Sequence, residues 1–219
     1  MVRSFEEAAG GTRAVIARSL LDVERLASSP RQLYAGYYQL LDAEVLLPDE
    51  IWGPLRGIAD EALFPRYKEK IKFAALSLND AGVPSYGECS LVLREDRIAH
   101  RASAFEGNSA LLMQEWAYNL PAGFRATWSQ RALLCVAKLA RLLMPQTTKV
   151  EFAGILLHAG ATPAEDDFVE VHVYGPMSCR SFERIVYTRP AGISPEDGTA
   201  IADALRVRLA KVGLDLEER

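Results

Sequence analysis

Hydrophobic residues recur along this chain with two different spacings, and the spacing changes near residue 70. Before that point, apolar side chains return every three to four positions, which is typical of an amphipathic helix. After it, apolar and polar side chains alternate over short runs, which is typical of a strand with one buried face. The pattern predicts a helical beginning, a strand-rich middle and a helical end.

Three helices are expected in the first part of the chain. The first covers residues 12–27. A second begins at Pro30, because Ser29 suits the N-cap position and proline suits the first helical position. The third covers residues 49–63. The apolar stripe of the first helix consists of Val15, Ile16, Leu20, Val23 and Ala27.

The remainder alternates less regularly between strands and helices. Strands are expected at residues 71–78, 88–94, 149–158, 168–174 and 182–188. Helices are expected to begin at Ser109, to cover residues 127–143, and to run from the cap at Ser194 to Gly213.

Because strands and helices are segregated, the predicted fold class is α+β rather than doubly wound. We expect N-terminal helices, a mostly antiparallel mixed sheet, one crossing helix and a C-terminal helix. A length of 219 residues fits a single domain. In this domain, residues 1–64 would form a helical part packed on an α+β core of residues 65–219.

Charge and hydropathy narrow the classes of partner. The net charge of -4 and the pI of about 5.5 disfavour a duplex nucleic-acid binder, which usually carries a basic stripe. The most apolar run, residues 132–144, contains Lys138 and Arg141 and is too short to span a bilayer. The N-terminus has early acids and no signal-peptide pattern. These features predict a cytoplasmic protein with no nucleic-acid or membrane partner, unless a dedicated machine secretes it.

Three widely spaced cysteines do not form a disulfide framework, and three distant histidines do not predict a metal site. Cys89 and Cys135 lie on apolar faces of their elements, whereas Cys179 is expected to be exposed. A cysteine-dependent enzyme with Cys179 as the nucleophile is therefore one functional hypothesis.

Residues 168–174 place an acid, an imidazole and a phenol in one row. Glu170, His172 and Tyr174 alternate with buried valines, so they share one face about 6–7 Å apart. In a cleft, Glu170 could stabilise a developing cation and His172 could orient a substrate. A solvated strand face is the alternative interpretation.

Two further segments carry groups that suit an anion. Residues 86–109 contain Arg101 and Ser103 and end at Ser109, where backbone N–H groups at a helix start would favour a phosphate. The alternative is an ordinary loop with an N-cap. Arg56, beside a glycine in residues 55–57, can present its guanidinium to a phosphate or carboxylate.

Taken together, segments 55–57, 86–109 and 168–175 resemble the spaced motifs of bacterial mono-ADP-ribosyltransferase-like domains, which occur in toxins and secreted effectors. The resemblance extends over residues 56–187 and leaves out the first helices. It implies NAD as a substrate and a cleaved nicotinamide–ribose bond.

The resemblance also implies residue roles. In that family, an arginine holds the NAD phosphate, a serine-containing segment braces the ribose pocket, and a late-strand glutamate stabilises the oxocarbenium-like transition state. Here these roles fall on Arg56 or Arg101, on Ser103 or Ser109, and on Glu170, while His172 and Tyr174 complete the predicted site.

A non-catalytic interaction module with a protein target or partner is the second functional hypothesis. Its candidate contact surface is aromatic, and core packing is the alternative role for the same residues: Tyr34, Tyr37, Tyr38 and Trp52.

Overall fold

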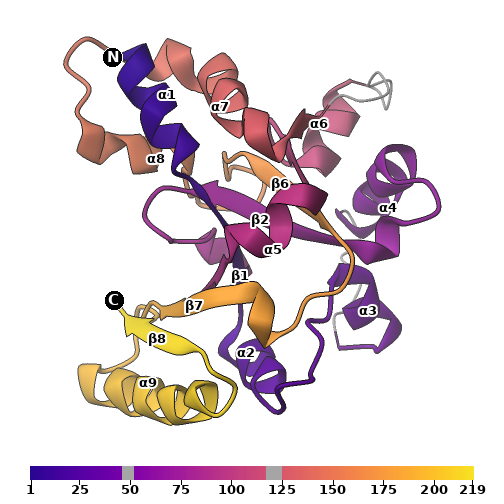
Figure 1. Cartoon of the computed structure of the whole chain (residues 1–219), viewed down its shortest axis with the longest axis vertical. Coiled ribbons are helices and arrows are strands. Elements are labelled where there is room, and N and C mark those ends of the chain that lie inside the picture. Colours follow the sequence, from indigo (N-terminus) through magenta and orange to yellow (C-terminus); the bar gives the residue numbers. More distant parts are fainter. Residues whose placement is uncertain (46–51, 117–124) are drawn as a thin grey trace.

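An eight-stranded sheet runs through the middle of the molecule in the computed structural model, which describes residues 1–45, 52–116 and 125–219 (Figure 1). The strand order is β5-β4-β6-β2-β1-β3-β7-β8. All neighbouring strands are antiparallel except β7 and β8. The strands are β1 (Arg13–Arg18), β2 (Ile71–Ser77), β3 (Cys89–Leu93), β4 (Ala102–Phe105), β5 (Ala126–Thr127), β6 (Glu170–Tyr174), β7 (Phe182–Tyr187) and β8 (Asp215–Glu218).

Helices surround the sheet, so the predicted α+β class is confirmed. They are α1 (Val2–Gly10), α2 (Leu20–Leu26), α3 (Tyr37–Asp42), α4 (Trp52–Leu63), α5 (Glu95–Ile98), α6 (Ser109–Glu115), α7 (Arg131–Leu139), α8 (Phe152–Leu156) and α9 (Pro195–Ala210). The predicted helices over α4, α6, α7 and α9 are confirmed, although residues 49–51 of the first lie outside the described residues. None of the helices within the described ranges is long and apolar enough to cross a membrane.

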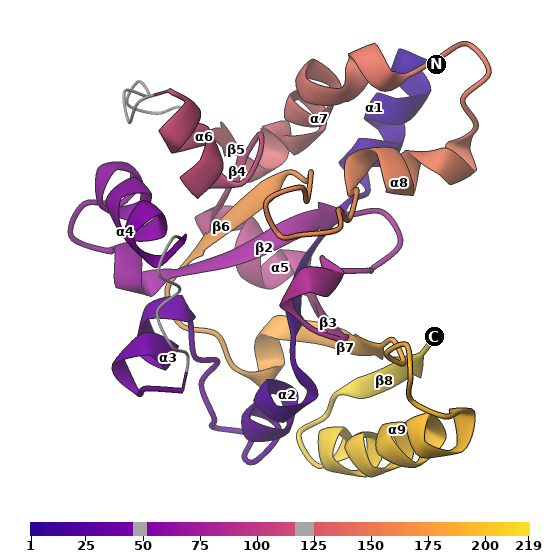
Figure 2. The same cartoon turned by 180° about the vertical axis from the view of Figure 1, so that it is seen from behind.

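One face of the sheet, here called the core face, is apolar and covered by helices. Val171 of β6 pairs with Ala74 of β2 and Ala104 of β4, so these side chains point to the same side. They join one hydrophobic core with Phe5 of α1 and Leu205 of α9. Figures 1 and 2 show α1, α7 and α8 grouped at one end of the sheet and α9 with β8 at the other.

The opposite face, here called the site face, carries the polar side chains of β6. The register sets His172 between Ser103 of β4 and Phe73 of β2, and Glu170 between Phe105 and Ala75. Helices α4 and α6 pack against each other over this end of the sheet (Figure 2). The fold thus places the predicted acid and imidazole beneath two helices.

The prediction of one helix over residues 12–27 was wrong. Residues 13–18 form β1 in the middle of the sheet, and only α2 is helical in that range. The helical spacing was accidental, because Ala14 to Ala17 are all buried, as expected for a strand covered on both faces. Residues 1–64 are therefore not a purely helical part, since they supply a central strand to the core.

Two other expected elements were also misassigned. Residues 149–158 form a 3-10 turn followed by α8 instead of a strand, because Glu151 caps the backbone N–H of Thr148 at 2.7 Å. The helix expected from Pro30 begins only at Tyr37, after Gly36. Five short elements had no sequence prediction: α1, α5, β4, β5 and β8.

Candidate functional site

Four of the predicted site residues meet under α4 and α6. The Arg56 guanidinium donates through Nη1 to Ser109 Oγ at 2.8 Å and through Nη2 to Glu170 Oε2 at 3.3 Å. The other oxygen of Glu170 accepts the Ser109 backbone N–H at 3.1 Å and lies 2.7 Å from His172 Nε2. We call Arg56, Ser109, Glu170 and His172 the arginine cluster.

The cluster joins three segments that are distant in the chain. Arg56 comes from α4, Ser109 is the first residue of α6, and Glu170 is the first residue of β6. Asn108 caps α6 by accepting the Ala110 N–H, and the same amide oxygen accepts Arg56 Nη2 at 3.1 Å. The cap therefore positions both the helix start and the guanidinium.

Two further side chains form an outer layer around Arg56. Asp60, one helical turn later, lies 3.6 Å from Arg56 Nη1 and accepts the Tyr38 hydroxyl at 2.8 Å. The guanidinium also stacks over the Phe73 ring, 4.5 Å from its centroid. The side chain of Arg56 keeps 15% of its surface exposed, whereas that of Glu170 keeps 3%. Arg56 is thus the member of this pair that solvent can still reach.

Electrostatics keep the Glu170 carboxyl ionised. Burial alone would raise its pKa, but Arg56, His172 and Ser109 outweigh burial and lower the pKa to about 2. For Arg56, burial opposes the charge, and the neighbouring carboxylates of Glu170 and Asp60 nevertheless raise its pKa. Burial raises the pKa of Asp60. The cluster therefore presents a fixed carboxylate held by a fixed guanidinium.

His172 has one engaged and one free ring nitrogen. Nε2 faces the ionised Glu170, so it carries the proton and donates it. Nδ1 is buried and has no hydrogen-bond partner among the described residues. The ring packs edge-on against Phe64 and Phe73, at centroid distances of 4.8 and 5.5 Å.

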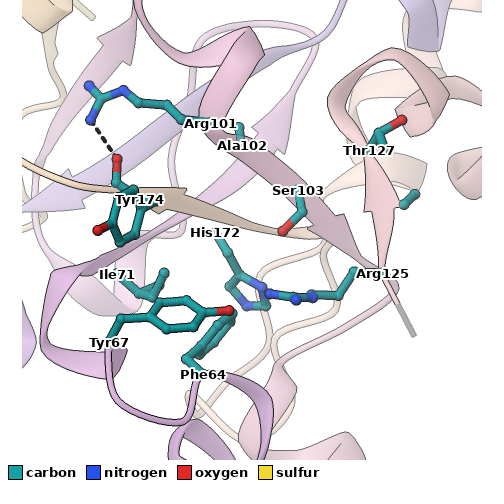
Figure 3. Close-up of a pocket in the computed structure, with 11 residues that line it drawn as sticks. Phe64, Tyr67, Ile71, Arg101, Ala102, Ser103, Arg125, Thr127, His172 and Tyr174 are labelled. Atoms are coloured by element: carbon teal, nitrogen blue, oxygen red, sulfur yellow. Dashed lines mark hydrogen bonds between the residues drawn. The ribbon is translucent and has the colours of Figure 1, made fainter. Parts of the chain in front are cut away.

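A pocket of about 590 Å³ opens beside His172 on the site face (Figure 3). Its lining combines arginine, hydroxyl and aromatic side chains: Phe64, Tyr67, Ile71, Arg101, Ala102, Ser103, Arg125, Ala126, Thr127, His172 and Tyr174. No carboxylate of the described residues belongs to this lining. Arg101 is braced there by the carbonyl oxygens of Tyr174 and Pro176, which accept Nη1 at 2.6 and 3.0 Å.

The predicted site residues therefore fall into two groups that share His172. Arg56, Ser109 and Glu170 belong to the arginine cluster, and the pocket lining contains the other three, which are Arg101, Ser103 and Tyr174. Among the residues that were not predicted, Asp60 had a signal, since it follows Arg56 by four positions on a helix. Arg125 had none, because nothing near it in the sequence marks a site.

The cysteine hypothesis conflicts with the structure at its key residue. Cys179 was expected to be exposed, but it is buried and its Sγ lies 3.4 Å from the Leu26 carbonyl oxygen. Burial raises the pKa of all three thiols, to about 12 for Cys89 and Cys135. These thiols are therefore protonated near neutral pH and are poor nucleophiles.

The residues predicted to form an aromatic contact surface do not all lie free at the surface. Tyr34 is buried, and its hydroxyl accepts Arg18 Nε at 2.6 Å. Tyr38 is tied to Asp60 and packs edge-on against Tyr37. The side chain of Trp52 lies outside what the structure describes. Tyr34 therefore packs in the hydrophobic core, which was the alternative role considered for these aromatic residues.

Comparison with known proteins finds no match for the chain, either among family models or among curated protein sequences. Function must therefore be argued from the chemistry of the site. Within the described ranges, no three His, Cys, Asp or Glu side chains come together as a set of metal ligands.

Proposed function

We propose that the protein cleaves the nicotinamide–ribose bond of NAD and transfers ADP-ribose, like the mono-ADP-ribosyltransferase-like domains that its three segments resemble. One observation carries this proposal. Arg56, Ser109 and Glu170 come from those three segments and lie within hydrogen-bonding distance of one another. The spans of 53 residues between Arg56 and Ser109 and 114 between Arg56 and Glu170 exclude sequence proximity as the cause.

The chemistry of the cluster suits this reaction. As nicotinamide leaves, positive charge develops on the ribose, and a fixed carboxylate stabilises that charge. Glu170 is ionised, and donors on both of its oxygens fix its direction. Loss of a comparable preorganised group costs about 10²–10³-fold in rate in other enzymes.

Substrate binding would redistribute the bonds of Arg56. Its guanidinium is the partly exposed side of the Arg56–Glu170 pair, and arginine binds phosphate oxygens in a bidentate manner. If Arg56 turns toward the diphosphate of NAD, Glu170 Oε2 becomes available to a ribose hydroxyl. In this proposal, Arg56 contributes to substrate binding and Glu170 contributes to catalysis.

Two variants separate these roles. In Glu170→Gln, we expect NAD binding to persist and turnover to fall at least about 100-fold. In Arg56→Gln, we expect NAD binding to weaken at least tenfold, because a charge-assisted contact is lost. Binding is measured by calorimetry, and turnover by release of nicotinamide. Full activity of Glu170→Gln would overturn the role of the carboxylate.

A matched control accounts for general loss of stability. Thr12 is a buried polar residue of a separate network, in which its hydroxyl accepts Arg131 Nε at 3.1 Å. We expect Thr12→Val to lower the melting temperature, as we also expect of the cluster variants, and to leave NAD turnover per folded molecule unchanged. Circular dichroism establishes that all three variants are folded.

A non-catalytic binding protein is the second candidate, favoured by the burial of Glu170 and by the bonds that already engage both of its oxygens. It predicts that NAD binds without release of nicotinamide. The same two assays therefore decide between the candidates.

A further inference from the structure

The pocket beside His172 has a cationic lining. Arg101 and Arg125 both contribute to it, and no ion pair within the described residues involves Arg125. The guanidinium of Arg125 lies 5.0 Å from the centroid of the Phe64 ring, and Figure 3 shows it directed toward His172. A guanidinium that meets no carboxylate among the described residues, in a recess lined by aromatic rings, attracts an anion.

The unpartnered nitrogen of His172 is the second observation. The residue is only 2% exposed, its ring lines the pocket, and Nδ1 has no partner among the described residues. Nε2 faces the Glu170 carboxylate, so in the tautomer that donates from Nε2 to this carboxylate, Nδ1 is an acceptor. A buried acceptor without a donor costs free energy, and a ligand hydroxyl or amide that reaches it would remove that cost.

The walls of the pocket suit a compact, partly flat molecule. Tyr67 packs edge-on against both Phe64 and Tyr174, at centroid distances of 5.8 Å in each case. Ser103 pairs with His172 across the two strands, so its hydroxyl lies on the same face. Rings and hydroxyl groups together are the usual lining for a sugar or nucleoside.

We propose that this pocket binds a sugar phosphate or nucleotide, whose phosphate pairs with Arg125 and whose hydroxyl or amide donates to His172 Nδ1. The proposal does not require NAD to be the ligand or a bond to be cleaved. It uses Arg125, which lies outside the arginine cluster, so its test is separate from that of Glu170.

Calorimetry with ribose 5-phosphate tests the anion contact. We expect saturable binding by the wild type, binding weakened at least tenfold in Arg125→Gln, and no detectable binding of unphosphorylated ribose. Arg206→Gln, on the exposed surface of α9, is the matched control and should bind as the wild type does. Equal affinity of wild type and Arg125→Gln, or no binding by the wild type, would overturn the proposal.

Nitrogen NMR of histidine-labelled protein tests the second contact. The chain has three histidines, and His172→Gln identifies the signal of the one in the pocket. We expect ribose 5-phosphate to move the Nδ1 resonance of His172 and to leave those of His100 and His158 in place. An unmoved His172 signal at saturation would reject the contact with Nδ1. Binding of ribose 5-phosphate without NAD turnover would leave this site standing and remove only the proposed activity.

Discussion

Glu170 keeps its charge in a buried position because it receives donors from three directions. Arg56, His172 and Ser109 together overcome the cost of taking the carboxylate out of water. The same bonds fix its direction, which a catalytic or binding carboxylate requires. The contacts that stabilise the negative charge of Glu170 are therefore also those that fix the position of its carboxylate.

Lys72 is the opposite case, a buried ammonium with little compensation. It is 4% exposed, and burial together with nearby Arg18 lowers its pKa. Among the described residues, the one acceptor of its Nζ is the Glu69 carbonyl oxygen at 3.5 Å. Replacing a poorly compensated buried charge by a hydrocarbon of similar length removes a desolvation cost. We expect Lys72→Met to raise the free energy of unfolding at pH 7 by about 1–3 kcal/mol.

The gain in the free energy of unfolding that we expect for Lys72→Met should decrease as the pH rises. A lowered pKa means that the folded protein holds the Lys72 proton less tightly than the unfolded chain does. Stability of the wild type therefore rises with pH between the folded and unfolded pKa values, and the advantage of Lys72→Met shrinks toward about pH 10. Denaturant titrations at pH 7 and pH 9.5 measure this, with exposed Lys70→Met as the control. A gain from Lys70→Met as large as that from Lys72→Met would contradict burial as the cause.

Single residues also show where sequence reasoning reached its limit. Arg56, Ser109 and Glu170 could be named from strand alternation, a helix start and the chemistry of an arginine, and a family resemblance then implied their roles. The sequence did not show that Ser109, rather than Ser103, would contact Arg56, because that choice depends on where α6 begins over the sheet. Arg125 lines the pocket only because β5 pairs with β4, and so short a strand has no detectable pattern.

At the scale of elements, alternation predicted strands well where a strand has one polar face. Residues 168–174 gave β6 because valines alternate with polar residues. Strand β1 was missed because it is buried on both faces and therefore lacks alternation. Strand β8 was missed because its acids, Asp215, Glu217 and Glu218, resemble a solvated tail.

The turn before β3 is a point where an element depends on one glycine. Gly87 has a φ of 134°, and a Cβ there would lie 2.1 Å from the Arg18 carbonyl carbon. This turn also brings Glu88 to the Leu20 N–H, at 2.9 Å. We expect Gly87→Ala to lower the free energy of unfolding by more than about 2 kcal/mol, because strain and a backbone clash add together.

Thermal and denaturant unfolding measure that loss. Gly107→Ala is the control, since an added Cβ at Gly107 meets nothing within 4 Å. Its effect should be within about 0.5 kcal/mol, as for an ordinary surface substitution. Equal stability of the two variants would show that the β1–α2 junction yields easily to an added methyl group.

At the scale of the whole molecule, ionisation of Glu170 in the arginine cluster makes the free energy of unfolding depend on pH in the acid range. The pKa of Glu170 is about 2 in the folded protein and 4.5 ordinarily, so the unfolded chain takes up its proton first as pH falls. The contribution of Glu170 is complete above about pH 4.5 and is lost progressively down to about pH 2. We expect the stability difference between wild type and Glu170→Gln to shrink over this range.

Denaturant midpoints at pH 7, 5, 4 and 3 measure that difference. Glu183→Gln serves as a comparison, since Arg13 lowers the pKa of this more exposed carboxyl at the far side of the sheet. Because surface ion pairs contribute less, its effect at pH 7 should be smaller than that of Glu170→Gln. A pH-independent difference for Glu170→Gln would mean that the buried carboxyl is not ionised.

The pairing of β6 with β2 has a consequence for how the chain folds. A shift of β6 by one residue would turn Glu170 and His172 toward the apolar core face of the sheet. Val171 and Val173 would then point to the site face, toward α4 and α6. In this shifted register, the Glu170 carboxylate would be buried without its ion-pair partner, the Arg56 guanidinium. Glu170 and His172 therefore favour the native alignment of β6, because a misaligned strand would bury both polar groups without their partners.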